Sequence, residues 1–369
     1  MSSHSLYAVP DVLVIGGGLI GLACAVAAAE RGFTVSVVAG HRTGEASPAA
    51  AGMLAPSIDR GEGPAHDFAI TARDRYPEYL AWLRERSGID VPLNRDGIIQ
   101  VALTEAGIRG LRRALPPHAR WLDATELTEL EPALAHALGG AFHPGDGAVD
   151  NVLLLDALRS VAESHPRVTV ASDTIRRLRF IPHLSAIGDS GTAYAAERIV
   201  LAAGAWSSTI AGLPRPLPVE PVRGQMLSYA IAPLRRVVYG PTGYLVPRDG
   251  RMLVGATMER AGFESVTTTE GVARLRRTAA EILPRVARLE PAEAWAGLRP
   301  ISADLQPILG PDPDEPRLIY ATGHSRNGVL MTPLTGDCIA AFLGGDAPPA
   351  DVSAFGIDRF TESEPTETA

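Results

Sequence analysis

The chain contains no lysine, so arginine supplies all 34 residues counted as lysine plus arginine. Three kinds of chemistry depend on a lysine: catalysis through a Schiff base, pyridoxal phosphate chemistry and the Gly-Lys phosphate loop of P-loop nucleotide hydrolases. All three are excluded. The 369-residue chain is long enough for a large core or for two domains.

Cysteine, basic charge and long apolar runs are also scarce. Cys24 and Cys338 both lie in helix-like apolar segments, which argues against a disulfide framework or a metal knuckle. The net charge of −8 argues against a nucleic-acid partner. No apolar run approaches the roughly 18 residues that a membrane span needs. The first thirty residues lack the basic segment of a signal peptide, so we expect a cytoplasmic protein without a membrane partner.

The N-terminal segment predicts a βαβ unit. An apolar run over 11–15 leads into Gly16, Gly18 and Gly21 in the spacing GxGxxG, and an alanine-rich helix and a second strand over 33–38 follow. This spacing between a strand and a helix is typical of a dinucleotide-binding turn. The helix N-terminus would supply N–H donors for phosphates. We therefore predict an α/β chain with a Rossmann-like domain.

One part of this fingerprint is missing. The second strand should end in an acidic residue for the ribose, but Ala39 and Gly40 stand there. Arg42 nearby is compatible with a 2′-phosphate, as in NADP, and equally with a solvated loop residue. The run of small residues over 44–56 also has two interpretations, a simple linker or a backbone that passes close to a flat or charged ligand.

The segment 219–299 has a different pattern, typical of an antiparallel sheet with one helix. A hairpin is predicted at Asp249 and Gly250, and a capping box from Thr267 to Glu270 should open the helix. This sheet is inserted between segments of the nucleotide-binding domain. The strand 198–203 reads as a buried parallel strand, and 317–345 as strand, loop and helix.

Several other features are interpreted as having no role in catalysis or metal binding. Gly188–Gly191 resembles a protease nucleophile loop but lies in a polar hairpin without a matching His–Asp pair. His136 and His143 should be surface residues, and no metal-ligand spacing is present. The pattern over 67–86 predicts one helix.

Five stretches together resemble one family. They are DVLVIGGGLIGLACA, AAAGMLAP, RIVLAAGAWS, GLRPISADLQPILG and ATGHSRNG. They are similar to the flavin-dependent D-amino-acid oxidase family, and within it to the glycine oxidases of the thiamine pathway. The resemblance runs from about residue 11 to 343.

The resemblance implies a discontinuous Rossmann-like FAD-binding domain and an α+β substrate domain built on an antiparallel sheet. The expected ranges are 1–90, 148–218 and 300–360 for FAD, 91–147 and 219–299 for substrate, and a disordered tail over 361–369. FAD would be non-covalent. Its expected contacts are Gly16, Gly18, Leu19, Ile20, Gly21, Ala39, Gly40, Ala46, Ser47, Ala51, Gly52, Met53, Ile175, Gly204, His324, Ser325, Arg326, Asn327, Gly328, Val329 and Leu330.

The same resemblance implies a substrate site. Arg299 would bind the substrate carboxylate through its planar guanidinium, with Tyr244 as a second donor. Arg326 would add a second positive charge, and Met258 and Met53 would line the pocket. No residue is assigned as a certain catalytic acid or base, and no metal is expected.

The implied reaction is oxidative deamination of glycine, with sarcosine or small D-amino acids as further substrates. Hydride would pass from Cα to flavin N5, and O2 would accept the electrons to give hydrogen peroxide. The imine would give glyoxylate and ammonia or supply thiamine thiazole synthesis. The alternatives are a sarcosine oxidase, a D-amino-acid oxidase or dehydrogenase of the same fold, and a flavin-binding protein without turnover. A homo-oligomer is compatible with the sequence.

Overall fold

The computed structural model describes residues 9–58 and 63–360. Contacts divide the chain into two compact units. Unit 1 comprises Met1–Arg42, Asp156–Glu220 and Pro300–Ala369, and unit 2 comprises Thr43–Leu155 and Pro221–Arg299. Residues 43–90 thus group with unit 2, although the predicted FAD domain included them. Contacts do not define function, so the functional division stays a prediction, and the predicted disordered tail lies outside the described residues.

Unit 1 is built on a six-stranded sheet in the order β19-β20-β13-β1-β2-β9, in which all neighbours except β19 and β20 pair in parallel. The strands are β1 (Val12–Ile15), β2 (Val35–Val38), β9 (Val168–Ala171), β13 (Arg198–Leu201), β19 (Ile308–Pro311) and β20 (Leu318–Thr322). The central strands are apolar at nearly every position because both faces of the sheet are covered. The predicted βαβ unit and the parallel strand are confirmed.

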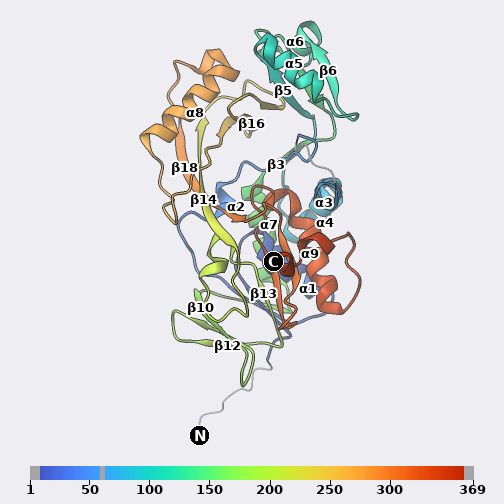
Figure 1. Cartoon of the computed structure of the whole chain (residues 1–369), viewed down its shortest axis with the longest axis vertical. Helices are drawn as coiled ribbons and strands as arrows, with labels where there is room; N and C mark the ends of the chain where they lie inside the picture. Colours follow the sequence, from blue (N-terminus) through green and yellow to red (C-terminus); the bar gives the residue numbers. More distant parts are fainter. Residues whose placement is uncertain (1–8, 59–62, 361–369) are drawn as a thin grey trace, which may run out of the picture. The chain divides into compact units, whose positions relative to one another are not determined.

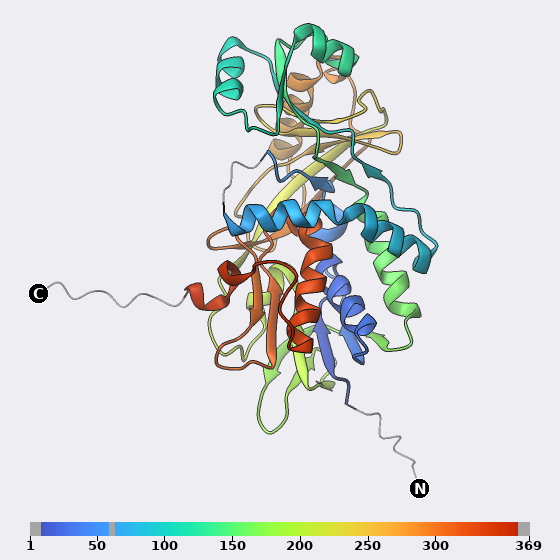
Figure 2. The same ribbon diagram turned by 90° about the vertical axis from the view of Figure 1, so that its right-hand side faces the viewer.

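Helices α1 (Leu19–Glu30) and α9 (Gly328–Gly344) lie side by side in unit 1 (Figures 1 and 2). They approach closely because Gly336 has no side chain: a Cβ there would lie 2.9 Å from the Ala23 carbonyl oxygen. Each helix follows one of the parallel strands, β1 or β20. Both N-termini therefore lie at the carboxyl edge of the sheet.

The remaining elements of unit 1 complete its core. A small antiparallel sheet holds β10 (Ile175–Arg179), β11 (Ser185–Gly188) and β12 (Ala193–Ala195). Helix α7 (Asn151–Ser164) leads into this unit, and short 3-10 helices occupy Gly204–Thr209, Ser353–Phe355 and Ile357–Phe360. Cys24 and Cys338 are both buried, and neither is part of a disulfide.

Unit 2 contains an eight-stranded sheet in the order β18-β14-β17-β16-β15-β5-β7-β6. Its strands are β5 (Ile98–Ala102), β6 (Arg120–Asp123), β7 (Gly139–His143), β14 (Val219–Tyr229), β15 (Val237–Tyr239), β16 (Tyr244–Arg248), β17 (Arg251–Gly255) and β18 (Glu293–Ser302). The hairpin between β16 and β17 turns at Asp249 and Gly250, both with positive φ, as predicted. Within this sheet β15 and β5 pair in parallel.

The two faces of this sheet have different covers. One face packs in a cluster with Leu275, Ala279 and Ile282 of α8 (Thr269–Ile282), the orange helix of Figure 1. The other face packs against the small-residue segment that contains Ala51 and Met53. A second sheet holds β3 (Met53–Leu54), β8 (Gly147–Val149) and β4 (Leu93–Asn94). The other helices of the unit are α2 (Ala46–Ala49), α3 (Pro64–Asp74), α4 (Tyr76–Ser87), α5 (Glu105–Arg113) and α6 (Ala124–Leu130).

Three local predictions were wrong. The segment 67–86 holds two helices, since α3 ends at Asp74 and α4 starts anew with Pro77 in its first turn. Thr268, not Thr267, caps α8 and accepts from Gly271 N, so Glu270 completes no capping box. His143 is buried, because it lies on β7 opposite Ile98 of β5.

Among the described residues no helix is long and apolar enough to cross a bilayer.

Candidate functional site

The glycine-rich turn of unit 1 has no room for side chains. Gly16 has φ +119°, and a Cβ there would lie 2.3 Å from the Ala202 carbonyl oxygen. A Cβ on Gly21 would lie 1.9 Å from the Gly16 carbonyl oxygen. The turn therefore brings bare backbone to the end of β1, as a pyrophosphate site requires.

Two helix N-termini lie at this edge of the sheet, and no nearby side chain offsets the positive ends of their helix dipoles. Gly18 precedes α1 and Asn327 precedes α9, and neither helix has a side-chain cap or an acidic residue in its first turn. The positive end of each helix dipole is thus available to a negative group. Gly204 of the predicted set follows β13 at the same edge, with φ +54°.

The ribose corner lacks a carboxylate at the expected position. A Cβ on Gly17 would lie 2.7 Å from the Ala39 Cβ, and one on Gly40 would lie 2.3 Å from the Thr174 Oγ1. Asp173 is close, but its carboxylate already accepts from Ser190, Thr174 and Tyr194. These hydrogen bonds lower the pKa of Asp173, so it is a structural anion. Ile175 of the predicted set is buried beside this corner.

The bend between β20 and α9 is polar in composition but largely buried. The His324 side chain is buried, and its Nε2 lies 3.1 Å from the Thr335 Oγ1. Burial lowers the pKa of His324 to about 3, so the imidazole is neutral. Ser325 has φ +52° and donates its N–H to the Pro300 carbonyl oxygen. Arg326 is exposed and carries the charge of the bend.

Arg299 of unit 2 lies flat over a glycine. A Cβ on Gly224 of β14 would lie 1.9 Å from the Arg299 Nη1 and 2.5 Å from its Cζ. The same Nη1 donates to the Thr257 carbonyl oxygen at 3.1 Å, so the guanidinium reaches from β18 across β14. In the described part of the chain no carboxylate lies within 4.0 Å of this half-buried guanidinium. Arg299 is thus a suitable partner for an external carboxylate.

Tyr244 reaches the same strand from the opposite side. Its ring lies over Gly255 of β17, where a Cβ would be 2.5 Å from the ring. Its hydroxyl lies 3.7 Å from the Met226 Sδ on β14. Gly224 and Met226 are two residues apart on one strand and so face the same side of the sheet. Arg299 and Tyr244 therefore converge on one face.

The small-residue segment 44–56, called the predicted flavin loop from here on, packs against this face within unit 2. Ala51 packs in a cluster with Met226, and Met53 and Tyr244 border the same cluster. Met258 does not join it and is 62 % exposed. Arg326 and His324 belong to unit 1.

Four residues important to this arrangement were missed. The sequence offered a local signal for Gly224 and Gly255, since a glycine inside a strand marks a close approach of another group. It offered no such signal for Arg248 and Asn151, which contact the predicted flavin loop. Gly188–Gly191 lies at the turn of the predicted hairpin, between β11 and β12, and the Ser190 hydroxyl donates to Asp173.

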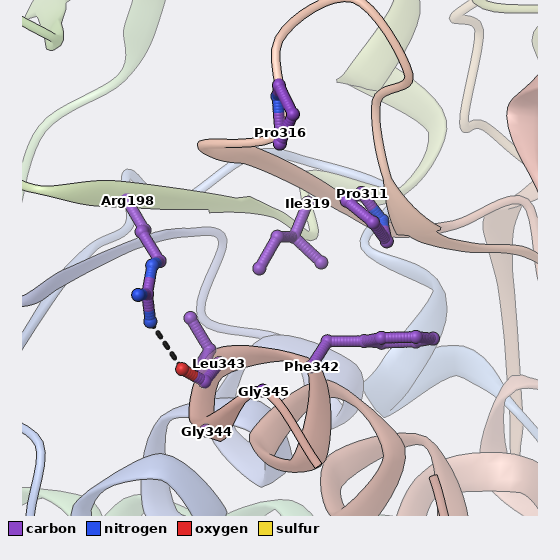
Figure 3. A pocket seen from close by; sticks show the side chains of 8 residues that line it. All are labelled: Arg198, Pro311, Pro316, Ile319, Phe342, Leu343, Gly344 and Gly345. Atoms are coloured by element: carbon purple, nitrogen blue, oxygen red, sulfur yellow. Dashed lines mark hydrogen bonds between the residues drawn. The ribbon is translucent and has the colours of Figure 1, made fainter. Parts of the chain in front are cut away.

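A separate cavity in unit 1 does not involve these residues (Figure 3). Its volume is about 340 Å³, and Arg198 at its wall donates to the Leu343 carbonyl oxygen. It lies where β13 begins and α9 ends, away from the carboxyl edge of the sheet. Its lining residues are Arg198, Pro311, Pro316, Ile319, Phe342, Leu343, Gly344 and Gly345. The described residues contain no group of His, Cys, Asp and Glu suited to a metal ion.

Comparison with known proteins decides the family. The model of the DAO family, described as FAD dependent oxidoreductase, matches residues 11–342. The chain belongs to this family. A glycine oxidase from Geobacillus kaustophilus is 34 % identical over 95 % of this chain and 97 % of its own length. The crystal structure of glycine oxidase from that species has a TM-score of 0.88 at 32 % identity and covers 96 % of this chain and 99 % of that chain.

A second relative is longer than this protein. The bifunctional protein ThiO/ThiG of Synechocystis is 36 % identical over 95 % of this chain, but the match covers only 54 % of that relative. The chain thus spans about half the length of this relative.

Membership in the DAO family makes the protein a flavin-dependent oxidoreductase with FAD as cofactor. Its residues fit that cofactor. The bare Gly16 turn and the uncapped α1 and α9 suit a diphosphate and an electron-rich ring edge. Ala39 provides no carboxylate for the ribose.

Proposed function

We propose that this DAO family member oxidises glycine, with O2 as acceptor. The supporting observation is the convergence of Arg299 and Tyr244 on one face of β14, above two glycines. Arg299 fixes the substrate carboxylate by a bidentate interaction, and the Tyr244 hydroxyl donates to the same group. Bound FAD supplies a two-electron acceptor for the C–H bond beside the amine.

The remaining steps need little from the protein. The substrate amine must lose one proton, and His324 is too deeply buried to accept it. We therefore infer that solvent takes this proton and that the side chains only orient the substrate. Met53 and Tyr244 pack against one apolar cluster, and we infer that they form an apolar wall of the substrate site. The imine product hydrolyses to glyoxylate and ammonia or passes to thiamine thiazole synthesis.

A peroxide assay on the yellow holoenzyme tests the proposal. Glycine, sarcosine and D-alanine are supplied at equal concentration, and peroxide and the keto acid are both measured. Glycine should give peroxide and glyoxylate in equal amounts. Faster turnover of sarcosine or D-alanine would reassign the substrate. Reduction of an artificial dye without peroxide would indicate a dehydrogenase, and no turnover of any amine would refute the oxidase.

A further inference from the structure

The carbonyl groups of the predicted flavin loop are held by side chains from distant parts of unit 2. Four carbonyl oxygens between residues 47 and 51 accept such hydrogen bonds, of which the one from Asn151 Nδ2 to Pro48 is long, at 3.5 Å, and the other three are short. The short bonds run from Asn151 Nδ2 to Ser47 at 2.7 Å, from Trp295 Nε1 to Ala49 at 2.9 Å and from Arg248 Nη2 to Ala51 at 2.6 Å. The loop is therefore fixed through its acceptors, which leaves its amide groups to face elsewhere.

Arg248 is the centre of this arrangement. Its side chain is 11 % exposed, and Nη2 also donates to the Val149 carbonyl oxygen at 3.1 Å. Its Nη1 donates to the Asn151 Oδ1 at 2.8 Å. A guanidinium can only donate, so the Asn151 oxygen must face it and the Asn151 amide must face Ser47. Arg248 and Asn151 thus act together on both ends of the loop.

The loop also has little freedom to move. Gly52 has φ +74°, and a Cβ there would lie 1.9 Å from the Val149 carbonyl oxygen. Val149 N donates to the Gly52 carbonyl oxygen at 2.8 Å. The backbone of the loop is thus locked against β8 on one side and against Arg248 on the other.

Two amides of this loop have no acceptor among the residues that the structure describes. Ala51 and Gly52 are buried, yet in the described residues their N–H groups donate to no backbone or side-chain acceptor. Buried N–H groups without a partner are rare, because each costs the free energy of a lost hydrogen bond. These two donors indicate an acceptor that residues 9–58 and 63–360 do not provide.

We propose that Arg248 and Asn151 are positioning residues that aim the Ala51 and Gly52 amides at acceptor atoms of FAD. This inference rests on the proposed role of the loop in FAD binding. It assigns the buried arginine a function beyond packing, since its hydrogen bonds fix which way the loop amides point. Trp295 supports the middle of the loop in the same way.

The test compares two arginines of unit 2. Arg248→Met removes the hydrogen bonds to the carbonyl oxygens of Ala51 and Val149 and to the Asn151 Oδ1. Arg236→Met removes a matched pair of bonds to the backbone carbonyls of Asp96 and Leu130, far from the loop in sequence. The affinity of each apoprotein for FAD is measured by flavin fluorescence, together with its thermal midpoint. We expect Arg248→Met to weaken FAD binding at least tenfold, while Arg236→Met changes stability but alters FAD affinity less than twofold.

A second variant keeps the test decisive if Arg248→Met does not fold. Asn151→Asp retains the acceptor for Arg248 but places a carboxylate against the Ser47 carbonyl oxygen. In Asn151→Asp the affinity for FAD should fall at least fivefold, and the visible flavin spectrum should shift. Arg248→Lys should bind FAD more tightly than Arg248→Met but more weakly than the wild type. Unchanged FAD affinity in Arg248→Met or Asn151→Asp would overturn the inference. FAD affinity is measured without substrate, so failure of the glycine oxidase proposal is detected separately by the peroxide assay.

Discussion

The Arg299 guanidinium lies directly on Gly224, so closely that a methyl group on Gly224 and the guanidinium could not both occupy their positions. Nη1, Nη2 and Cζ would all lie within 2.6 Å of a Cβ at this position. Gly224 is therefore part of the proposed carboxylate site although it has no side chain. Its role is to let a long side chain cross the strand at van der Waals distance.

Gly224→Ala should weaken substrate binding with little loss of stability. The added methyl displaces the end of a flexible side chain rather than backbone, so the fold adapts while Arg299 leaves its position. We expect KM for glycine to rise roughly tenfold, which corresponds to about 1.4 kcal/mol, with FAD still bound. Gly110→Ala is the control, since Gly110 lies in α5 with open space around it. Equal KM values for the two variants would contradict this role of Gly224.

Arg299→Ala and Tyr244→Phe should interact in a double-mutant cycle. Arg299→Ala should raise KM for glycine roughly 30-fold or more, since hydrogen bonds to a charged group contribute about 1.5–3 kcal/mol. Tyr244→Phe should raise it roughly fivefold. If both side chains bind one carboxylate, the effects will not add, because the second loss is smaller once the carboxylate is free. Strict additivity would place the two residues on different groups of the substrate.

The glycine turn could be predicted because its signal is local. Gly16, Gly18 and Gly21 occur within six residues, between a strand and a helix, and no distant contact is needed to interpret them. The same holds for the hairpin at Asp249 and Gly250, whose two turn residues specify the geometry.

The substrate face could not be predicted from such signals alone. The positions of Arg299 and Tyr244 depend on the register of β14, β17 and β18, which are separated by long stretches of sequence. Arg248 precedes the predicted hairpin turn in the sequence, and only the fold brings its side chain to the Ala51 carbonyl oxygen. The prediction that His143 lies on the surface was wrong for the same reason. His143 is buried by the pairing of β7 with β5, which no local pattern predicts. Pairing between distant strands therefore limits what local patterns can predict.

Cys24 and Cys338 should be unreactive in the native protein. Both thiols are buried, and burial raises the pKa of Cys24 well above its usual range, so the reactive thiolate is suppressed. A thiol reagent should label neither cysteine in buffer and both in denaturant without reductant. Fast native labelling would show that the interface of α1 and α9 opens readily, and absence of free thiols in denaturant would reveal a disulfide.

His143 should make stability fall as the pH is lowered. Burial lowers its pKa to about 4, below the value of 6.5 expected in the unfolded chain, so between these values the unfolded state binds more protons. The stabilisation is fully present above pH 6.5 and is lost as the pH falls toward about 4. His143→Gln can keep a hydrogen bond to Gln100 but cannot titrate. Between pH 6 and 4.5 its free energy of unfolding should decrease by roughly 2 kcal/mol less than that of the wild type. Denaturant titrations at several pH values measure this difference, with the exposed His136→Gln as control. Equal slopes for His143→Gln and the wild type would show that His143 is protonated in the folded protein at these pH values.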